Sequence, residues 1–490
     1  MTRVQALAAA AAHFDSGAFV RDLARRVAIR TESQDEASAP ALHSYLADEI
    51  GPSLEALGFD CRIHANPEPA YGPLLIGTRH EDDALPTVLV YGHGDVIRGQ
   101  DKSWKRGQGP WLLAAEGERL YGRGTADNKG QHSINIAALA QVLAARSTLG
   151  DAPGARRGRL GFNVKFLVET GEETGSPGLA EFCTRERAAL HADALIASDG
   201  PRLARHRPTH FLGTRGVANF ELSLALREGA HHSGNWGGLL RNPGTVLANA
   251  IACLVDGRGR ILVPGLRPPP IPANVRAALE GVEFGGEPGD PAVDRDWGEP
   301  GLTPSERVIA WNTLEVLAYR TGNPEHPINA IPPSAKATMH MRFVVGTDLS
   351  RLREVVAEHL AAHGFGDIEV GAPVVMAATR LDPDNAWVRF VQASITRTVG
   401  AAPVVLPNLG GSLPNDVFSE ILGLPTVWVP HSYPACSQHA PDEHLLAPVA
   451  REALQIMTGV FWDLGDQAAL EQREGPALQE GTERLPRRRR

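Results

Sequence analysis

The chain has 490 residues, of which 43% are hydrophobic and 21% charged, the proportions of a soluble globular protein with two or three domains. Its 48 basic and 57 acidic side chains give a formal charge of −9, which argues against nucleic acid as a partner. No apolar run approaches the roughly 20 residues that span a bilayer, which argues against a membrane protein. The four cysteines form no CxxC pair, so the sequence predicts no disulfide framework and favours a reducing, cytoplasmic location.

The two ends of the chain are each predicted to have a simple structural role. The alanine run Ala8–Ala12 is interpreted as the start of a helix and not as a signal peptide, because one basic residue lies nearby and His13 and Asp15 follow at once. Residues 466–490 end in Arg487–Arg490 and are expected to form a disordered, solvated tail.

Residues 1–208 alternate short apolar runs with helix-like segments. The runs Val88–Tyr91, Val164–Val168 and Ala194–Ala197 are typical of buried strands, and Asn135–Ala145 is typical of a helix. Strand, helix and strand at this spacing favour crossover units and a largely parallel sheet. We expect this region to be the first part of a catalytic domain.

Residues 209–375 follow a different pattern. Phe220–Leu226 and Ala337–Val345 alternate apolar and polar residues, as half-exposed strands do, and Leu349–His363 follows as a helix. Between them, 262–300 is dense in proline and glycine and is expected to be an ordered, irregular insertion. This part of the chain therefore predicts an α+β domain.

The first pattern returns over residues 376–465. A helix is expected at Trp387–Val399 and a strand at Thr426–Val429. The sequence thus predicts an α/β catalytic domain, 1–208 and 376–465, into which a second domain, 209–375, is inserted.

Polar residues follow several of the predicted strands, where the loops of an open α/β sheet form one crevice. His93 comes just after a strand, and Asp95 could orient its imidazole, although a His-X-Asp pair taken alone is more often structural. Asp127 stands at the start of a predicted helix, where an N-cap role explains it equally well.

Three further segments add carboxylates and an imidazole. Glu172 and Glu173 are adjacent, and like charges this close call for a cation or a proton between them, unless they form a solvated acidic loop. Asp199 follows a strand and could equally form an Asp-Gly turn. His439 follows the last strand more closely than His444, which is expected to pack or cap.

Together these residues predict a centre of two metal ions. Two imidazoles and three carboxylates suit zinc, with manganese or cobalt as substitutes, and five ligands suit two ions that share Asp127. Glu172 is left free as a general base. The predicted ligands are His93, Asp127, Glu173, Asp199 and His439.

This order of motifs resembles the dinuclear-zinc peptidases and deacylases, a family that includes carnosinase, aminoacylase, carboxypeptidase G and succinyl-diaminopimelate desuccinylase. The resemblance covers roughly residues 15–465. It implies a mixed, largely parallel sheet flanked by helices, of the zinc exopeptidase type, with the inserted domain serving as a lid and as the surface of a homodimer. The length of the lid, about 165 residues (209–375), is most like that of the carnosinase-type dipeptidases.

The resemblance also assigns roles to the motif residues. His93 and Asp199 would hold one Zn²⁺, Glu173 and His439 would hold the other, and the carboxylate of Asp127 would bridge them. In the family the peptide bond from this aspartate to the next residue, here Asn128, is often cis. Asp95 would orient His93. Glu172 would take a proton from the attacking water and pass it to the leaving amine.

Residues of the lid match the family's substrate-binding segments. His232, in a His-Ser-Gly segment, would reach across the dimer to stabilise the oxyanion; without the resemblance it would be a surface histidine beside a turn. Asn329 and Arg342 would bind the carbonyl and the carboxylate of the substrate. Gly411 and Ser412 would close on that carboxylate.

The function expected from these residues is hydrolysis of a small substrate with a free carboxylate, with a dipeptidase favoured. An N-acyl-amino-acid deacylase would use the same machinery and is the alternative. A non-catalytic binding protein on this fold should have lost a ligand or the base, whereas Glu172 and all five ligands are present.

Overall fold

The computed structural model describes residues 2–147, 158–286 and 290–474. These residues form two compact units. Unit 1 holds the described residues of Met1–Pro208, Arg389–Pro403 and Glu420–Arg490, and unit 2 holds those of Thr209–Val388 and Val404–Ser419. The expected break after residue 208 coincides with this division, whereas residues 376–388 and 404–419 group with unit 2.

Unit 1 is built on a sheet with the strand order β1-β2-β6-β3-β7-β17. The pairs β3–β6, β3–β7 and β7–β17 are parallel, and β1–β2 and β2–β6 are antiparallel. The sheet is therefore mixed and largely parallel. The apolar runs predicted its parallel strands, and its mixed character agrees with what the resemblance implies. Its strands are β1 (Asp60–His64), β2 (Leu74–Arg79), β3 (Thr87–His93), β6 (Asn163–Glu169), β7 (Ala194–Ala197) and β17 (Thr426–Trp428), and a separate small sheet contains β4 (Ala114–Glu116), β5 (Arg119–Tyr121) and β18 (His444–Leu446).

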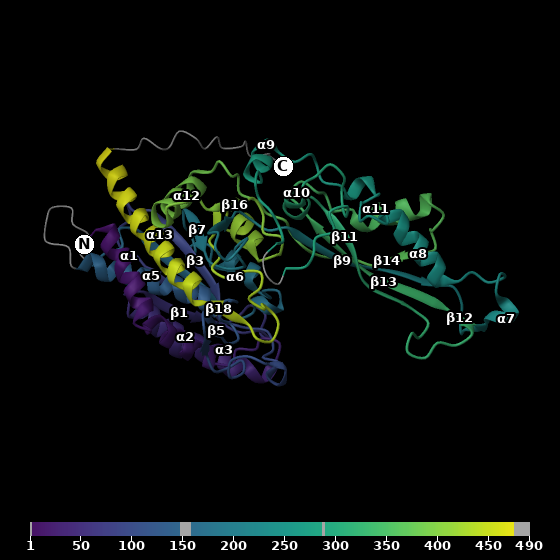
Figure 1. The fold of residues 1–490 in the computed structure, drawn as a ribbon, viewed down its shortest axis with the longest axis horizontal. Coiled ribbons are helices and arrows are strands. Elements are labelled where there is room, and N and C mark those ends of the chain that lie inside the picture. Colours follow the sequence, from purple (N-terminus) through teal and green to yellow (C-terminus); the bar gives the residue numbers. More distant parts are fainter. Residues whose placement is uncertain (1, 148–157, 287–289, 475–490) are drawn as a thin grey trace. The chain divides into compact units, whose positions relative to one another are not determined.

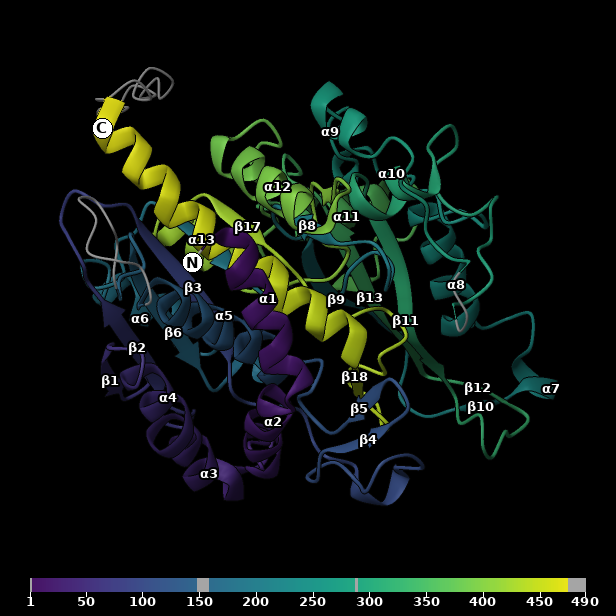
Figure 2. The ribbon, with the colours of Figure 1, turned by 60° about the vertical axis from the view of Figure 1, so that its left-hand side comes forward.

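Helices flank this sheet, as expected. Helix α5 packs against β3, and α1, α2 and α13 pack against α5 (Figures 1 and 2). The alanine run lies inside α1, which begins with a capping box of Thr2 and Gln5. The helices are α1 (Arg3–Asp15), α2 (Ala18–Ala28), α3 (Ala39–Ser44), α4 (Gly51–Glu55), α5 (Lys129–Ser147), α6 (Leu179–Arg185), α12 (Ala386–Val399, which crosses from unit 2 into unit 1) and α13 (Ala447–Glu474).

Helix α13 extends beyond the expected start of the tail. Residues 466–474 are helical, and Asp466 accepts a hydrogen bond of 2.9 Å from buried Arg146 of α5. This contact holds the helix against unit 1 past residue 465. The rest of the expected tail, 475–490 with Arg487–Arg490, lies outside the described residues.

Unit 2 contains an antiparallel sheet with the strand order β11-β13-β9-β14, and β15 also pairs with β9. Burial alternates along β9 and β13, as the sequence predicted, and α8 and α11 pack against the apolar face. The elements are β8 (Thr209–Phe211), β9 (Gly216–Ala225), β10 (His231–His232), α7 (Ser233–Trp236), α8 (Pro243–Leu254), α9 (Ala273–Ala278), α10 (Pro304–Ile309), β11 (Thr313–Thr321), β12 (Ala330–Ile331), β13 (Ser334–Phe343), α11 (Leu352–Ala362), β14 (Glu369–Val370), β15 (Val374–Met376) and β16 (Val404–Leu406).

Two smaller features complete unit 2. The described part of 262–300 contains helix α9 and a short 3₁₀ turn, Pro264–Leu266, and is otherwise irregular. Strand β16 pairs in parallel with β8, which groups residues 404–419 with this unit. Within the described ranges of both units, no helix combines the length and the apolarity needed to cross a membrane.

The turn before α5 is tightly packed around a glycine. A methyl group on Gly130 would lie 2.0 Å from the carbonyl oxygen of Thr125, well inside van der Waals contact. This turn carries Asp127, so its backbone path decides where that carboxylate points.

Replacing Gly130 with alanine should therefore lower the free energy of unfolding by about 1–3 kcal/mol, since the backbone must move to accept the methyl group. Denaturant unfolding measures this change. Gly257→Ala is the matched control, because a methyl group added there would meet no atom within 4 Å beyond its chain neighbours, and the backbone of Gly257 is not left-handed. Equal stability of the two variants would show that the turn accommodates a side chain.

Candidate functional site

The carboxyl ends of four parallel strands lie at one edge of the unit 1 sheet. His93 ends β3 and is paired in register with Glu169, which ends β6. Loops after these strand ends converge, which is the usual place for a site in an open α/β sheet. They carry the predicted residues Asp95 after β3, Glu172 and Glu173 after β6, Asp199 after β7 and His439 after β17.

One predicted ligand group is fully buried. Nε2 of His93 lies 3.0 Å from Oδ1 of Asp127 and 3.6 Å from Oδ2 of Asp199. One donor atom from each residue lies within 4.8 Å of the other two, so the three could hold a single metal ion. Asp127 lies in the turn before α5, and its peptide bond to Asn128 is cis, as expected from the resemblance.

The second predicted group meets the other oxygen of the same carboxylate. Nε2 of His439 lies 2.9 Å from Oδ2 of Asp127 and 3.0 Å from Oε2 of Glu173. These three donor atoms also fall within 4.8 Å of one another. Asp127 therefore belongs to both groups and presents one oxygen to each, the arrangement of a bridging ligand.

Glu172 and Asp95 lie beside these groups. Oε2 of Glu172 is 3.9 Å from Nε2 of His93, and Glu172 belongs to neither ligand group. Nδ1 of His93 faces both oxygen types of Asp95, the carbonyl at 3.1 Å and the carboxylate at 3.4 Å. The same carboxylate accepts hydrogen bonds from the backbone amides of Glu172 and Glu173, at 3.2 and 3.1 Å. Asp95 thus holds both the imidazole and the acidic turn.

The charges of this cluster fit a cationic occupant. Burial raises the pKa of Glu173 to about 7 and that of Asp199 to about 6, and the negative charge of Asp127 adds to both shifts. Hydrogen bonds with Asp127 and Glu173 raise the pKa of His439 to about 11. Oδ2 of Asp199 is buried without a hydrogen-bond partner. Divalent cations would supply the charge and the bonds that these oxygens lack.

A buried ion pair that sequence reasoning missed positions Asp127. Glu443 accepts hydrogen bonds from the backbone amides of Ala126 and Asp127, at 2.9 and 3.1 Å, and pairs with Arg123 at 2.7 Å. Nε2 of Gln438 also donates to Oδ2 of Asp127, at 2.6 Å. All three supporting residues lie within five residues of a predicted ligand, Asp127 or His439, but no local pattern pointed to them.

The two histidines that follow β17 have different surroundings, as expected. His444 is buried, hydrogen-bonds Tyr433 at 2.6 Å and contacts the carbonyl of Asp442 at 2.9 Å, so it packs away from the ligand groups. His439 adopts a left-handed backbone with φ of 59°, which is uncommon outside glycine. A constrained backbone of this kind is often found where a side chain must be aimed at a site.

In unit 2, the structure brings His232 and Asn329 together. His232 pairs with Ala330 in the β10–β12 ladder, and the carbonyl of Asn329 accepts hydrogen bonds from the amide and the hydroxyl of Ser233 at 2.9 and 3.1 Å. Nδ1 of His232 accepts a hydrogen bond of 3.1 Å from the amide of Gly234. The ring proton of a neutral imidazole then stays on Nε2, which makes the exposed His232 a donor.

Arg342 lies near the carboxyl end of β13, beside the predicted Gly411–Ser412 loop. It donates a hydrogen bond of 2.7 Å to Oγ of Ser412, which in turn donates one of 2.7 Å to the carbonyl of Arg215. Arg215, which the sequence did not single out, is nine-tenths buried, and its Nη1 has no hydrogen-bond partner. The guanidinium groups of Arg342 and Arg215 therefore both lie beside this loop.

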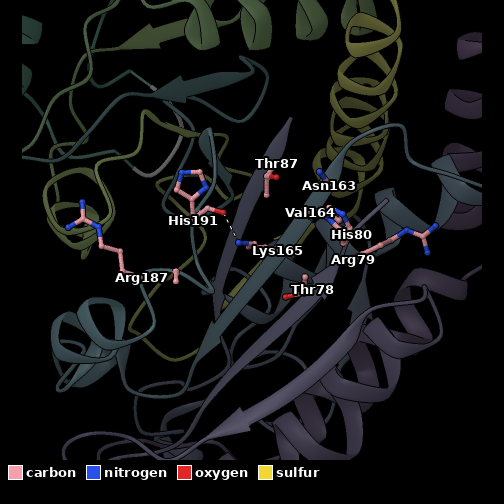
Figure 3. A pocket seen from close by; sticks show the side chains of 10 residues that line it. Thr78, Arg79, His80, Thr87, Asn163, Val164, Lys165, Arg187 and His191 are labelled. Atoms are coloured by element: carbon pink, nitrogen blue, oxygen red, sulfur yellow. Dashed lines mark hydrogen bonds between the residues drawn. The ribbon is translucent and has the colours of Figure 1, made fainter. Parts of the chain in front are cut away.

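A separate basic hollow of about 670 Å³ lies where β3 and β6 begin (Figure 3). Thr87 and Asn163 line it, and Nζ of Lys165 donates 2.7 Å to the carbonyl of His191 on its wall. Because these are the amino ends of the strands, the hollow is at the opposite edge of the sheet from the ligand groups.

The sequence matches Peptidase family M20/M25/M40 over residues 89–463. It is 26% identical over 389 residues to the cysteinylglycine-S-conjugate dipeptidase of Corynebacterium striatum, covering 76% of this chain and 79% of the relative. It is 25% identical over 466 residues to the Cys-Gly metallodipeptidase DUG1 of Candida albicans, covering 87% and 90% of the two chains.

The fold agrees with this match. The structure of human carnosine dipeptidase 1 superimposes with a TM-score of 0.73 at 21% identity, covering 95% of this chain and 99% of that one. The expected α/β fold and the resemblance drawn from the motifs are thereby confirmed. The family match begins within β3 and covers all the predicted ligand residues and the whole of unit 2, and the chain belongs to Peptidase family M20/M25/M40.

Proposed function

We propose that this protein is a metal-dependent dipeptidase that hydrolyses dipeptides with a free carboxylate. The observation that carries the proposal is the pair of ligand groups that share Asp127, with the carboxyl of Glu172 next to them. The names of its curated relatives, dipeptidases for Cys-Gly and Cys-Gly conjugates, support a dipeptide as the substrate.

In this proposal two Zn²⁺ ions, with Mn²⁺ or Co²⁺ as substitutes, occupy the two groups. His93 and Asp199 hold one ion, and Glu173 and His439 hold the other. When bound, the ions supply the positive charge that polarises the scissile carbonyl and acidifies water. The mixed nitrogen and oxygen donors suit zinc.

Glu172 is the proposed general base and acid. Burial raises the pKa of Glu172 well above its ordinary value, which suits a group that must first accept a proton from water and then give it to the leaving amine. Asp95 fixes the turn that carries Glu172 through the amide of that residue. A non-catalytic protein would not need this arrangement.

Substrate recognition is proposed for Arg342, Ser412 and Gly411. The guanidinium of Arg342 lies 2.7 Å from the hydroxyl of Ser412, and a carboxylate placed there would receive the other N–H donors of Arg342. The hydroxyl of Ser412 could add its proton only by leaving the carbonyl of Arg215. Neighbouring Arg215 adds positive charge to the same loop. We propose Asn329, which lies beside His232, as the donor to the carbonyl of the substrate, and like His232 it would act from a second copy of the chain.

His232 is proposed to act from a second copy of the chain. Ser334, next to the His232 ladder, and Arg342 are eight residues apart on β13, about 26 Å at the usual rise of a strand. A dipeptide spans only about 7 Å, far less than this part of β13, which supports contacts to Arg342 and His232 that come from different copies. The edge strand β11 exposes Val316, Leu317 and Tyr319, which supports a homodimer through the lid.

The free cysteines are consistent with a proposed cytoplasmic location. The proposal rests on the spacing of the four cysteines, which includes no CxxC pair: Cys61, Cys183, Cys253 and Cys436.

The first test is hydrolysis by metal-free protein that has been reconstituted with Zn²⁺, Mn²⁺ or Co²⁺. Dipeptides with a free carboxylate should be cleaved only after a metal is added, and the matching dipeptide amides should be poor substrates. Preference for N-acyl amino acids over dipeptides would identify a deacylase instead. Absence of cleavage from the fully loaded protein would contradict an enzymatic function.

Glu172→Ala should leave metal content unchanged and lower kcat on the order of 10²- to 10⁴-fold, because the ligand groups survive while the base is lost. Elemental analysis and steady-state kinetics measure the two effects. Glu181→Ala, an exposed carboxylate of α6, is the control and should behave as the wild type. Release of metal from Glu172→Ala would mean that the roles of Glu172 and Glu173 are exchanged.

His232→Ala should keep its metals and lose about 10²- to 10³-fold in kcat, as expected when one oxyanion donor is removed. His326→Ala, also exposed in unit 2, should be neutral. If His232 acts across a dimer, mixing His232→Ala with Arg342→Ala under subunit exchange should restore turnover, because mixed dimers contain one intact site. No recovery in exchanged dimers would place His232 and Arg342 in separate functions.

A further inference from the structure

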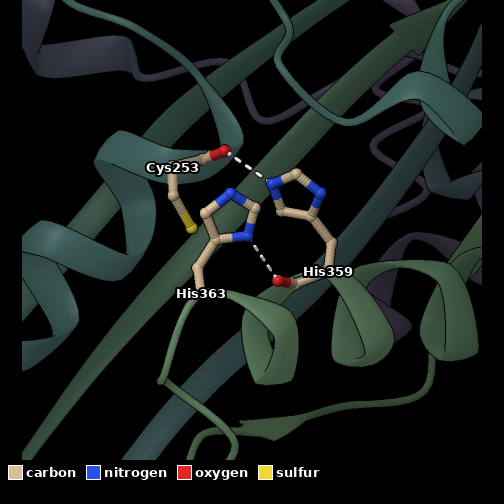
Figure 4. A group of neighbouring side chains, drawn as sticks. All are labelled: Cys253, His359 and His363. Carbon is tan, nitrogen blue, oxygen red and sulfur yellow. Dashed lines mark hydrogen bonds between the residues drawn. The ribbon is translucent and has the colours of Figure 1, made fainter.

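Unit 2 contains a second kind of donor cluster, remote in sequence from the peptidase motifs. Cys253 lies in the last turn of α8, and His359 and His363 lie four residues apart at the end of α11 (Figure 4). One donor atom from each of the three lies within 4.8 Å of the other two. Helices α8 and α11 pack against each other, so the cluster joins two elements of the same core.

The hydrogen bonds of the cluster determine where the imidazole protons lie. Nδ1 of His363 is 2.8 Å from the carbonyl of His359, which can only accept, so the ring donates there and keeps a lone pair on Nε2. A backbone carbonyl bound to one ring nitrogen is the usual support of a metal-binding histidine. The second ring, His359, stacks on the first with centroids 4.2 Å apart.

The other two donors must give up present partners to bind a metal. Nε2 of His359 donates to the carbonyl of Cys253 at 2.9 Å, and the thiol of Cys253 donates to the carbonyl of Ala250 at 3.0 Å. Coordination moves the His359 proton from Nε2 to Nδ1 and releases the thiol proton to solvent. The net result is one metal–thiolate bond, two metal–imidazole bonds and one proton released per ion.

A purely structural role accounts for part of this arrangement. His359 satisfies a carbonyl of the last turn of α8, and His363 satisfies one near the end of α11, as helix ends require. That role uses the two imidazoles but gives no reason for a thiol to share their space. A sulfur and two imidazoles together match the donors of Zn²⁺ and related borderline cations, unlike the oxygen-rich groups of unit 1.

We propose that Cys253, His359 and His363 form a further metal site, which takes a single Zn²⁺ and fastens the end of α8 to the end of α11. The fourth position of the tetrahedral ion is left for water, since three protein donors are present in the cluster. The site is separate from the proposed catalytic pair in both its residues and its donor chemistry.

Cobalt substitution tests the site directly, because a thiolate bound to Co²⁺ gives a charge-transfer absorption that oxygen and nitrogen donors do not. Metal-free full-length protein titrated with Co²⁺ should develop this band, and Cys253→Ser should abolish it. Asp127→Asn, which disrupts the proposed catalytic pair, should keep the band, so the result is independent of the proposed function. A missing band in the wild type would overturn the proposal.

Zinc content provides the second measurement. Elemental analysis after dialysis should give one Zn²⁺ more per chain for the wild type than for Cys253→Ser or His363→Gln, and Zn²⁺ should raise Tm less in these variants. Cys61→Ser is the matched control, since this thiol is also half-buried and belongs to no donor group among the described residues. His363 is exposed, so its variant should fold. Equal zinc content in all four proteins would refute the site.

Discussion

The metal centre depends on holding three carboxylates close together away from water. Asp127, Glu173 and Asp199 repel one another in the charged form, and burial adds to the cost of their ionisation. The imidazoles of His93 and His439 offset part of this charge. The negative charge that the imidazoles do not offset requires cations. The same ions would therefore balance the charge of unit 1 and supply its proposed chemistry.

The strand ends and the candidate ligand residues could be predicted because both are marked by a short local pattern in the sequence. An apolar run followed by a polar cluster marks a buried strand and its loop, and parallel strands place those loops at one edge. His93 ends such a strand, and Asp199 and the Glu172–Glu173 pair lie in the loops that follow two others. The alternation along β9 and β13 likewise reflects one buried face and one exposed face.

The supports of the site could not be predicted, because they join distant parts of the chain. Arg123 and Glu443 are separated by 320 residues, and their pairing exists only after the loop at the end of unit 1 has folded back. Arg215 could not be predicted either, because a lone arginine before a strand does not indicate that its Nη1 will be buried without a hydrogen-bond partner. Helix α13 extends beyond residue 465, the expected end of the catalytic domain, because Arg146 of α5 binds Asp466.

The length of one strand limits how unit 2 could contribute to the proposed catalysis. Because β13 is hydrogen-bonded on both sides, by β9 and β11, it is a stiff element that keeps its two ends apart. Arg342 lies at one end, and the ladder of His232 lies next to the other, beside β12 and α7 (Figure 2). While this sheet is preserved, the rise along β13 keeps Ser334 and Arg342 about 26 Å apart, well beyond the roughly 7 Å of a dipeptide. If His232 and Arg342 both contact the substrate, this separation favours contributions from two copies of the chain, and the proposed catalysis would then depend on self-association.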